Sequence, residues 1–155
     1  MPAKPRAQVA AGAVVAVLSA AFAANAADVA DGEKVFAENC AVCHQKGGVG
    51  APGLAPPLVS AHVKAAAAKN PAYAVGIILN GMSGPLPLDG GDSISGIMPP
   101  VGLGLSDADV AAVAAYVLNS LNGGQATIDA KTVTDLRSQK HSAKELRAMR
   151  EELLK

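Results

Sequence analysis

The chain has 155 residues, no net charge, and a composition that is half apolar but drawn mostly from Ala and Val. It has no basic stripe and few aromatic side chains to stack on bases, which argues against nucleic-acid binding. With no Trp, two Phe and two Tyr, the chain has little bulk to fill a dense core, so the composition leaves room for a large cofactor.

Residues 1–26 have the pattern of a secretory signal peptide. Lys4 and Arg6 form a positive start, residues 9–24 are uncharged and apolar, and a small-residue cleavage sequence ends at Ala26. We expect cleavage there; a retained membrane anchor is the alternative, although the stretch is slightly short for a span. The mature chain would carry 11 basic and 13 acidic residues, have no membrane span and lie in the periplasm.

Residues 27–124 predict one small all-α domain. Gly and Pro are frequent in residues 45–57 and 81–105, which are therefore expected to be irregular, and no strand pattern competes. Helices are expected between these loops, where apolar residues and capping residues suit them. They are a helix from Asp31 into Cys40, a helix over residues 58–69, one over residues 72–79 and one capped by Ser106.

Residues 125–155 differ in character and form a C-terminal helical extension. They hold seven basic and five acidic residues. Ser142 and Glu145 form a capping-box pattern that opens an amphipathic helix, with Leu146, Met149 and Leu153 expected to point inward. Such a helix could clasp its own core or dock to an enzyme.

The sequence Cys40-Ala41-Val42-Cys43-His44 carries the chemistry. C-x-x-C-H is the attachment signature of c-type haem. Two thiols three residues apart on a helical turn can reach two vinyl groups on one porphyrin edge, and the next residue, His44, then lies under the iron. A thioredoxin-like redox pair or half of a zinc site are the competing interpretations, but the first needs a βαβ setting and the second needs more ligands.

A haem iron that carries electrons needs a second strong ligand, and a thioether raises its reduction potential. Met98 lies in a Gly- and Pro-rich loop before the last helix of the domain, and Pro99 stiffens that loop. Met82 is the reserve candidate, whereas Met149 falls on the amphipathic stripe of the extension. Ligation by a second histidine, His62, is the remaining option.

The order of these motifs resembles class I cytochrome c. A helix, C-x-x-C-H, a Gly-rich loop, Pro-Pro-Leu, a helix, a second Gly-rich loop, Met-Pro, Ser-Asp and a Tyr-containing helix follow one another between residues 28 and 122. The resemblance implies a helical cytochrome c fold around one covalently bound haem c, with His44 as proximal and Met98 as distal ligand. It also implies that the carbonyl of Pro56, or less well that of Pro57, accepts the Nδ1 proton of His44.

A soluble electron carrier without substrate chemistry of its own is the function expected from this resemblance. Its partners would be a periplasmic dehydrogenase or reductase on one side and a terminal oxidase or another cytochrome on the other. A dedicated cytochrome subunit, docked to an enzyme through the C-terminal helix, is the alternative. A five-coordinate haem enzyme or sensor would require that Met98 does not bind the iron.

Overall fold

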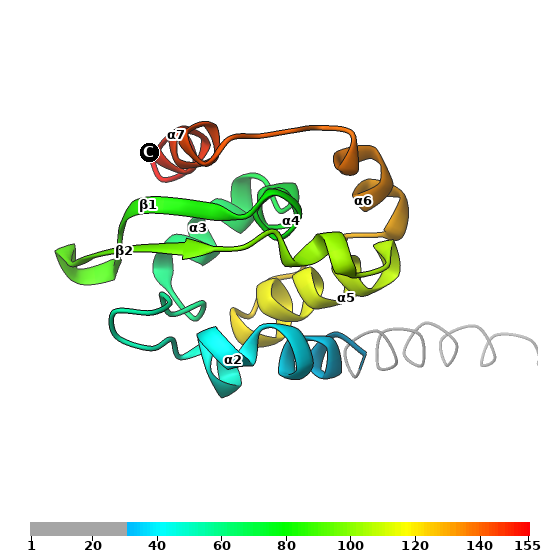
Figure 1. Cartoon of the computed structure of the whole chain (residues 1–155), viewed down its shortest axis with the longest axis horizontal. Helices are drawn as coiled ribbons and strands as arrows, with labels where there is room; N and C mark the ends of the chain where they lie inside the picture. Colours follow the sequence, from blue (N-terminus) through cyan, green and yellow to red (C-terminus); the bar gives the residue numbers. More distant parts are fainter. Residues whose placement is uncertain (1–30) are drawn as a thin grey trace, which may run out of the picture.

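The computed structural model describes residues 31–155, so the signal peptide predicted over residues 1–26 lies outside the described part (Figure 1). Within the described residues, no helix combines the length and apolar character needed to cross a membrane. Residues 31–39 are helical. The elements that follow are α2 (Ala41–His44), η1 (Lys46–Gly48), α3 (Ala61–Lys69), α4 (Ala72–Asn80), β1 (Met82–Pro87), η2 (Asp89–Gly91), β2 (Ser93–Met98), η3 (Val101–Gly104), α5 (Asp107–Ala115), η4 (Tyr116–Leu121), α6 (Ala130–Arg137) and α7 (Ala143–Leu153).

The predicted helices are present, with their ends set by the expected capping residues. Ser106 caps α5, since its hydroxyl accepts a hydrogen bond from the amide of Asp109 at 3.1 Å. Helix α3 begins later than predicted because Ser60 is its N-cap and accepts from the amide of Val63. Gly81, with φ of 76°, ends α4, which extends one residue beyond the predicted range.

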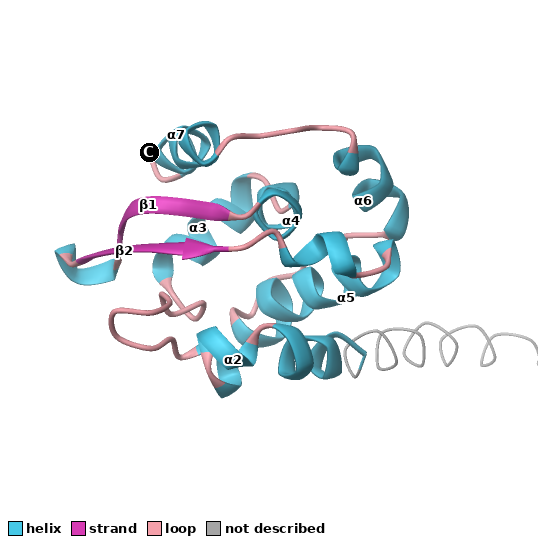
Figure 2. Cartoon of the chain, viewed as in Figure 1, coloured by secondary structure: helices cyan, strands magenta, loops and turns pink. Residues whose placement is uncertain are grey.

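The prediction that residues 81–105 contain no strand is wrong, and the described chain is mostly helical rather than all-α. Strands β1 and β2 form an antiparallel hairpin, drawn in magenta in Figure 2. The Gly and Pro residues of this segment led to the prediction of a loop, because both residue types are depleted in strands. In a two-stranded hairpin each strand keeps one free edge, and at that edge a proline such as Pro85 loses no ladder hydrogen bond.

The main core lies where the helix over residues 31–39 crosses α5. Phe36 packs on Tyr116, with ring centroids 5.5 Å apart and planes inclined by 50°. A side chain on Gly32 would collide with the backbone of Ala112, so glycine permits this close crossing. Fully buried Val75 of α4 joins the same cluster and ties the crossing to the helix that precedes the hairpin.

The C-terminal extension packs onto the domain. Val133 of α6 is fully buried in the main core. Leu146 of α7 is 1% exposed and forms a second cluster with Ala66 and Tyr73. Helix α7 packs beside strand β1 and helices α3 and α4, on the side of the hairpin away from α2 (Figure 1).

The capping box at the start of α7 is confirmed, but the predicted inward position of Met149 is wrong. Met149 is 40% exposed. The face that packs inward instead carries Leu146, Arg150 and Leu153, which are spaced at i, i+4 and i+7. Met149 lies three residues after Leu146, at the edge of this face, and its side chain is therefore partly exposed to solvent.

Candidate functional site

One apolar cavity collects every side chain that the sequence singled out for haem binding. It lies between two walls: the near wall, formed by α2 and the loop that follows it, and the far wall, formed by the hairpin and α7. Helices α3 and α4 supply the rest of the lining. The predicted site residues that line it are Cys40, Cys43, His44, Pro56 and Met98, together with the reserve candidates Met82 and His62.

A single helical turn presents the two thiols and the imidazole. The amides of Cys43 and His44 both donate to the carbonyl of Cys40, at 3.2 and 2.9 Å. Residues three apart lie on one face of such a turn, so the two thiols share a side and His44 follows directly. Gln45 then ends the turn with φ of 61°. Both thiols are free and partly exposed.

His44 is buried, at 6% exposure, and its ring is held in one tautomer. Its Nδ1 lies 3.0 Å from the carbonyl oxygen of Pro56. A carbonyl can only accept, so Nδ1 carries the proton and Nε2 keeps a lone pair for a ligand. Burial lowers the pKa of His44, and the hydrogen bond to Pro56 opposes this shift. The ring is therefore presented as a neutral imidazole, the form that binds a metal.

The loop after α2 is folded so that the Pro56 carbonyl meets this ring. The amide of Gly50 donates to the carbonyl of His44 at 2.8 Å, and Gly50 has φ of 78°. A Cβ on Gly50 would lie 2.6 Å from the nitrogen of Pro57 and 2.8 Å from the carbonyl carbon of Pro56. Only glycine lets the two backbone segments approach this closely.

The two candidate methionines are register partners on the hairpin. Met82 opens β1 and pairs with Met98 at the end of β2, and both side chains line the cavity. They belong to different packing groups, however. Met98 packs in the cluster that also contains Cys40, whereas Met82 packs with Tyr73 and Leu146 under α7.

The donor set of this cavity fits an iron porphyrin. Burial, and secondarily the neighbouring Cys43, raises the pKa of Cys40 to about 11. Redox-active C-x-x-C pairs instead have a thiol whose pKa lies below the ordinary value, so the raised pKa of Cys40 differs from that pattern. The groups that a covalently attached haem requires are two thiols, a neutral imidazole with a free Nε2, a thioether on the facing wall and an apolar lining.

Sequence reasoning missed the residues that the extension brings to the far wall. Arg150 of α7 lines the cavity, and Arg147 donates to the carbonyl of Ser83 on β1. The phenol of Tyr73 donates to the carbonyl of Leu146 at 3.0 Å, and burial raises the pKa of this phenol to about 12. No local pattern announces these contacts, since each joins residues more than sixty positions apart.

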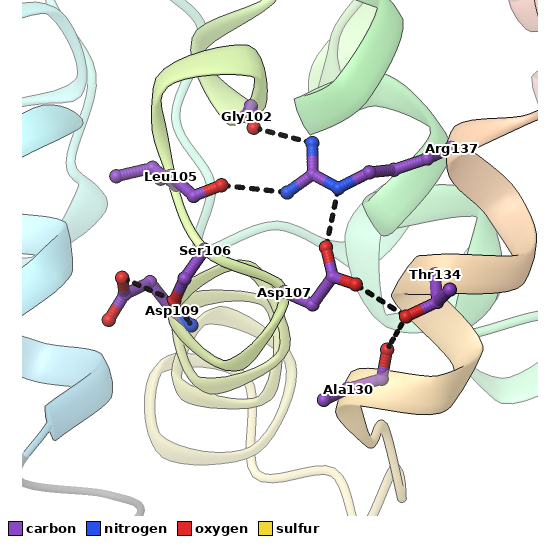
Figure 3. A network of polar contacts seen from close by, with 8 residues as sticks. All are labelled: Gly102, Leu105, Ser106, Asp107, Asp109, Ala130, Thr134 and Arg137. Atoms are coloured by element: carbon purple, nitrogen blue, oxygen red, sulfur yellow. Dashed lines mark hydrogen bonds and ion pairs between the residues drawn. The ribbon is translucent and has the colours of Figure 1, made fainter.

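A third arginine of the extension fixes the turn that follows Met98. Figure 3 shows Arg137 of α6 between the carbonyls of Gly102 and Leu105, at 3.0 and 2.7 Å, and the carboxylate of Asp107, at 2.5 Å. Thr134 donates to the second oxygen of the same carboxylate. The extension therefore contacts the chain at both strands: α7 binds β1, and α6 binds the turn that follows β2.

Comparisons with known proteins indicate the family of this chain. The family model described as cytochrome c oxidase, cbb3-type, subunit III matches residues 27–117. Cytochrome c-552 of Thermus thermophilus is 32% identical over 131 residues, which cover 80% of this chain and 97% of the relative. Cytochrome c6 of a Synechocystis species is 35% identical over 108 residues, which cover 70% of this chain and 78% of the relative.

Proposed function

The chain belongs to the cytochrome c family, and on that premise we propose that it is a periplasmic electron carrier whose single haem iron is bound by His44 and Met98. Members of the family carry covalently bound haem c and are electron carriers rather than enzymes. When bound, haem c supplies an iron that takes up and releases one electron.

The observation that carries this proposal is the convergence of Cys40, Cys43 and His44 with Met98 on one apolar cavity. The thiols would hold the porphyrin as thioethers, and Nε2 of His44 would bind the iron. The hydrogen bond from His44 Nδ1 to Pro56 would fix the ring and raise its basicity as a ligand. Two ligands on packed walls change position little between oxidation states, which favours rapid electron transfer.

Met98 is a better candidate for the distal ligand than Met82. Its side chain packs against the main core, as that of Cys40 does, and lines the facing wall of the cavity. Met82 packs under α7 instead. The rigid Pro99-Pro100 sequence follows Met98 directly, and η3 is anchored by Arg137 just beyond it.

Exposed apolar side chains at the cavity wall mark where a redox partner would approach. Val42 on α2 and Ile97 on β2 are 75% and 82% exposed, and both line the cavity. Electron transfer between proteins needs a short path, so an apolar rim at the thioether edge suits a transient complex. The apolar face of α7 is covered by its own chain, which weighs against a dedicated subunit docked through that face.

The periplasmic location rests on the signal-peptide pattern of residues 1–26. N-terminal sequencing of the exported protein tests this part of the proposal, with Ala27 expected as the first residue.

Expression with haem-maturation machinery, followed by a denaturing gel, tests the covalent attachment. The wild-type band should retain haem colour, and the Cys40→Ser, Cys43→Ser double variant should lose it. A colourless wild-type band with two titratable thiols would overturn the proposal.

The distal ligand is tested by Met98→Ala with Met82→Ala as its matched control. Met98→Ala should lower the reduction potential and open the iron to added imidazole, because a thioether ligand raises the potential. Met82→Ala should leave the potential and the oxidised spectrum near those of the wild type. The reverse result would assign the ligand to Met82.

A further inference from the structure

Arg150 is a cationic side chain of the extension that borders the apolar cavity without an acidic partner. Its Nη2 donates to the carbonyl of Pro87 at 2.8 Å and contacts Nδ1 of His62 at 3.0 Å. Among the described residues, no carboxylate lies within ion-pair distance of this guanidinium, and its Nη1 and Nε make no hydrogen bond. The guanidinium is therefore held in place by Nη2, while Nη1 and Nε can still donate hydrogen bonds to a ligand.

The nearby acidic residue is already engaged elsewhere. The carboxylate of Asp89 accepts from the amides of Ala61 and His62, at 2.6 and 3.2 Å, and so caps helix α3. Nδ1 of His62 lies 3.1 Å from this carboxylate and 3.0 Å from Nη2 of Arg150. Because a guanidinium can only donate, Nδ1 accepts from Arg150, and the bonds that engage Asp89 are those from the two amides. Asp89 thus anchors the start of α3, and although it acts on Arg150 through space, it does not form an ion pair with it.

The position of Arg150 in the cavity indicates what its partner would be. The cysteines on α2 fix the vinyl-derived edge of the macrocycle, and the propionates of haem lie on the opposite edge. Figure 1 shows α2 and α7 on opposite sides of the molecule, with the hairpin between them. Arg150 is the only Lys or Arg among the described residues that line the cavity, and its guanidinium lies at Pro87 and His62 rather than at α2. The propionates are the only charged substituents of the macrocycle, so they are the groups that this cation would meet.

We propose that Arg150 is a carboxylate-binding residue that pairs with a haem propionate, with His62 and the Pro87 carbonyl holding its guanidinium in position. This inference rests on the proposed function, since it requires haem attached at α2. It gives the C-terminal extension a role in the cofactor site. A guanidinium binds a carboxylate through two parallel hydrogen bonds, and such a pair is strengthened by the low dielectric of an apolar cavity.

The reduction potential of the haem-loaded protein tests this pairing. Removing a positive charge near the haem stabilises the oxidised iron, so Arg150→Gln should lower the potential. Lys144→Gln is the matched control, because Lys144 is exposed on the same helix and its loss changes the net charge equally. We expect the shift for Arg150→Gln to be at least threefold larger, and Arg150→Lys to restore most of it.

Resonance Raman spectroscopy supplies a second signature, since the propionate bending band reports hydrogen bonding to the carboxylates. This band should move in Arg150→Gln and stay in place in Lys144→Gln. Equal potential shifts in the two variants, with an unmoved band, would overturn the inference while leaving the proposed function intact. If Arg150→Gln accumulates without haem, the propionate band of Arg150→Lys is compared with that of Lys144→Gln instead. A band that moves in Arg150→Lys alone supports the inference, and an unmoved band overturns it. A wild-type protein without covalent haem would instead overturn the proposed function itself.

Discussion

The near and far walls of the cavity are held together by different kinds of contact. In the near wall, the hydrogen bonds from Gly50 to His44 and from His44 to Pro56 join residues six and twelve positions apart. In the far wall, Arg147 and Arg150 reach back to β1 across 64 and 63 positions. The near wall is thus built by local folding of one segment, whereas the far wall joins a hairpin to a helix that lies more than forty positions further along the chain.

This difference implies a division of roles. The near wall carries the thiols and the imidazole, which must be in place before and during covalent attachment. The far wall carries the methionine and the charged groups that would set the potential of the bound haem. Substitutions in the extension should therefore change the properties of the site without preventing attachment, and substitutions in the near wall should affect the proximal ligand directly.

Leu146→Ala is the strongest way to break the far wall alone. Leu146 is the buried anchor of α7, and its truncation should destabilise the protein by about 3 kcal/mol through lost burial and the resulting cavity. The urea midpoint of the haem-loaded protein measures this loss. Met149→Ala on the same helix should cost less than about 1 kcal/mol because Met149 is largely exposed. Equal losses for the two variants would show that α7 is not anchored through Leu146.

Gly50→Ala is the corresponding test of the near wall. An added Cβ combines a left-handed backbone with a collision against Pro56 and Pro57, so a loss of about 2 kcal/mol or more is expected. Gly53→Ala is a matched control in the same loop. Gly53 has φ of 75° but nothing near the position of a Cβ, so strain alone should cost about 1 kcal/mol.

The two variants also differ in their expected effect on the site. Gly50→Ala should displace the carbonyl that holds His44 and alter the absorption spectrum of the reduced protein, whereas Gly53→Ala should not. If both variants lose the same stability and keep the same spectrum, the contact between Gly50 and the Pro56-Pro57 backbone has no role in holding His44.

The near wall could be predicted from the sequence because its contacts join residues that are close together in the chain. The spacing of Cys40, Cys43 and His44 places them on one helical turn, and the Gly- and Pro-rich loop after them was recognised as such. The helices were predicted equally well, because Ser106 and Gly81 act as caps within their own segments.

The far wall could not be predicted because its determinants are tertiary. Pro85 and Gly96 argue against strands, yet the hairpin forms where the α7 arginines and the apolar cavity cover it. The inward position of Met149 was inferred from apolar character, but the helix rotates to place Arg150 at the cavity. The sequence of a helix does not reveal that one of its arginines faces inward, because the reason is a partner from another part of the chain.

Ser142→Ala weakens the far wall by a smaller amount. Ser142 accepts from the amide of Glu145 at 3.2 Å, and the carboxylate of Glu145 accepts from the amide of Ser142 at 2.7 Å. Losing this capping box should cost about 1 kcal/mol. Thermal unfolding followed by circular dichroism measures the loss, and Ser138→Ala, outside α7, should change the midpoint less. A null result for Ser142→Ala would mean that α7 is held by its packing alone.

The smallest expected effect concerns the link between the extension and the turn after Met98, and it depends on pH. Hydrogen bonds from Thr134 and Arg137 lower the pKa of Asp107 below its ordinary value of 3.8. The folded state therefore binds this proton less readily than the unfolded state. The resulting stabilisation is complete above about pH 5 and is lost as the pH falls below 3.8 toward the pKa of the folded state.

Asp107→Asn should accordingly lower the thermal midpoint at pH 7 by a few degrees at most, since the carboxylate is solvent-accessible. The difference in midpoint between the variant and the wild type should narrow as the pH falls below 3.8. Asp92→Asn is the control, because the Asp92 side chain makes no hydrogen bond to the described residues. A gap that stays constant from pH 7 to pH 3 would show that Asp107 contributes by shape rather than charge. Arg137 would then hold the turn after Met98 through the carbonyls of Gly102 and Leu105 alone, and the far wall would be insensitive to acid at this end.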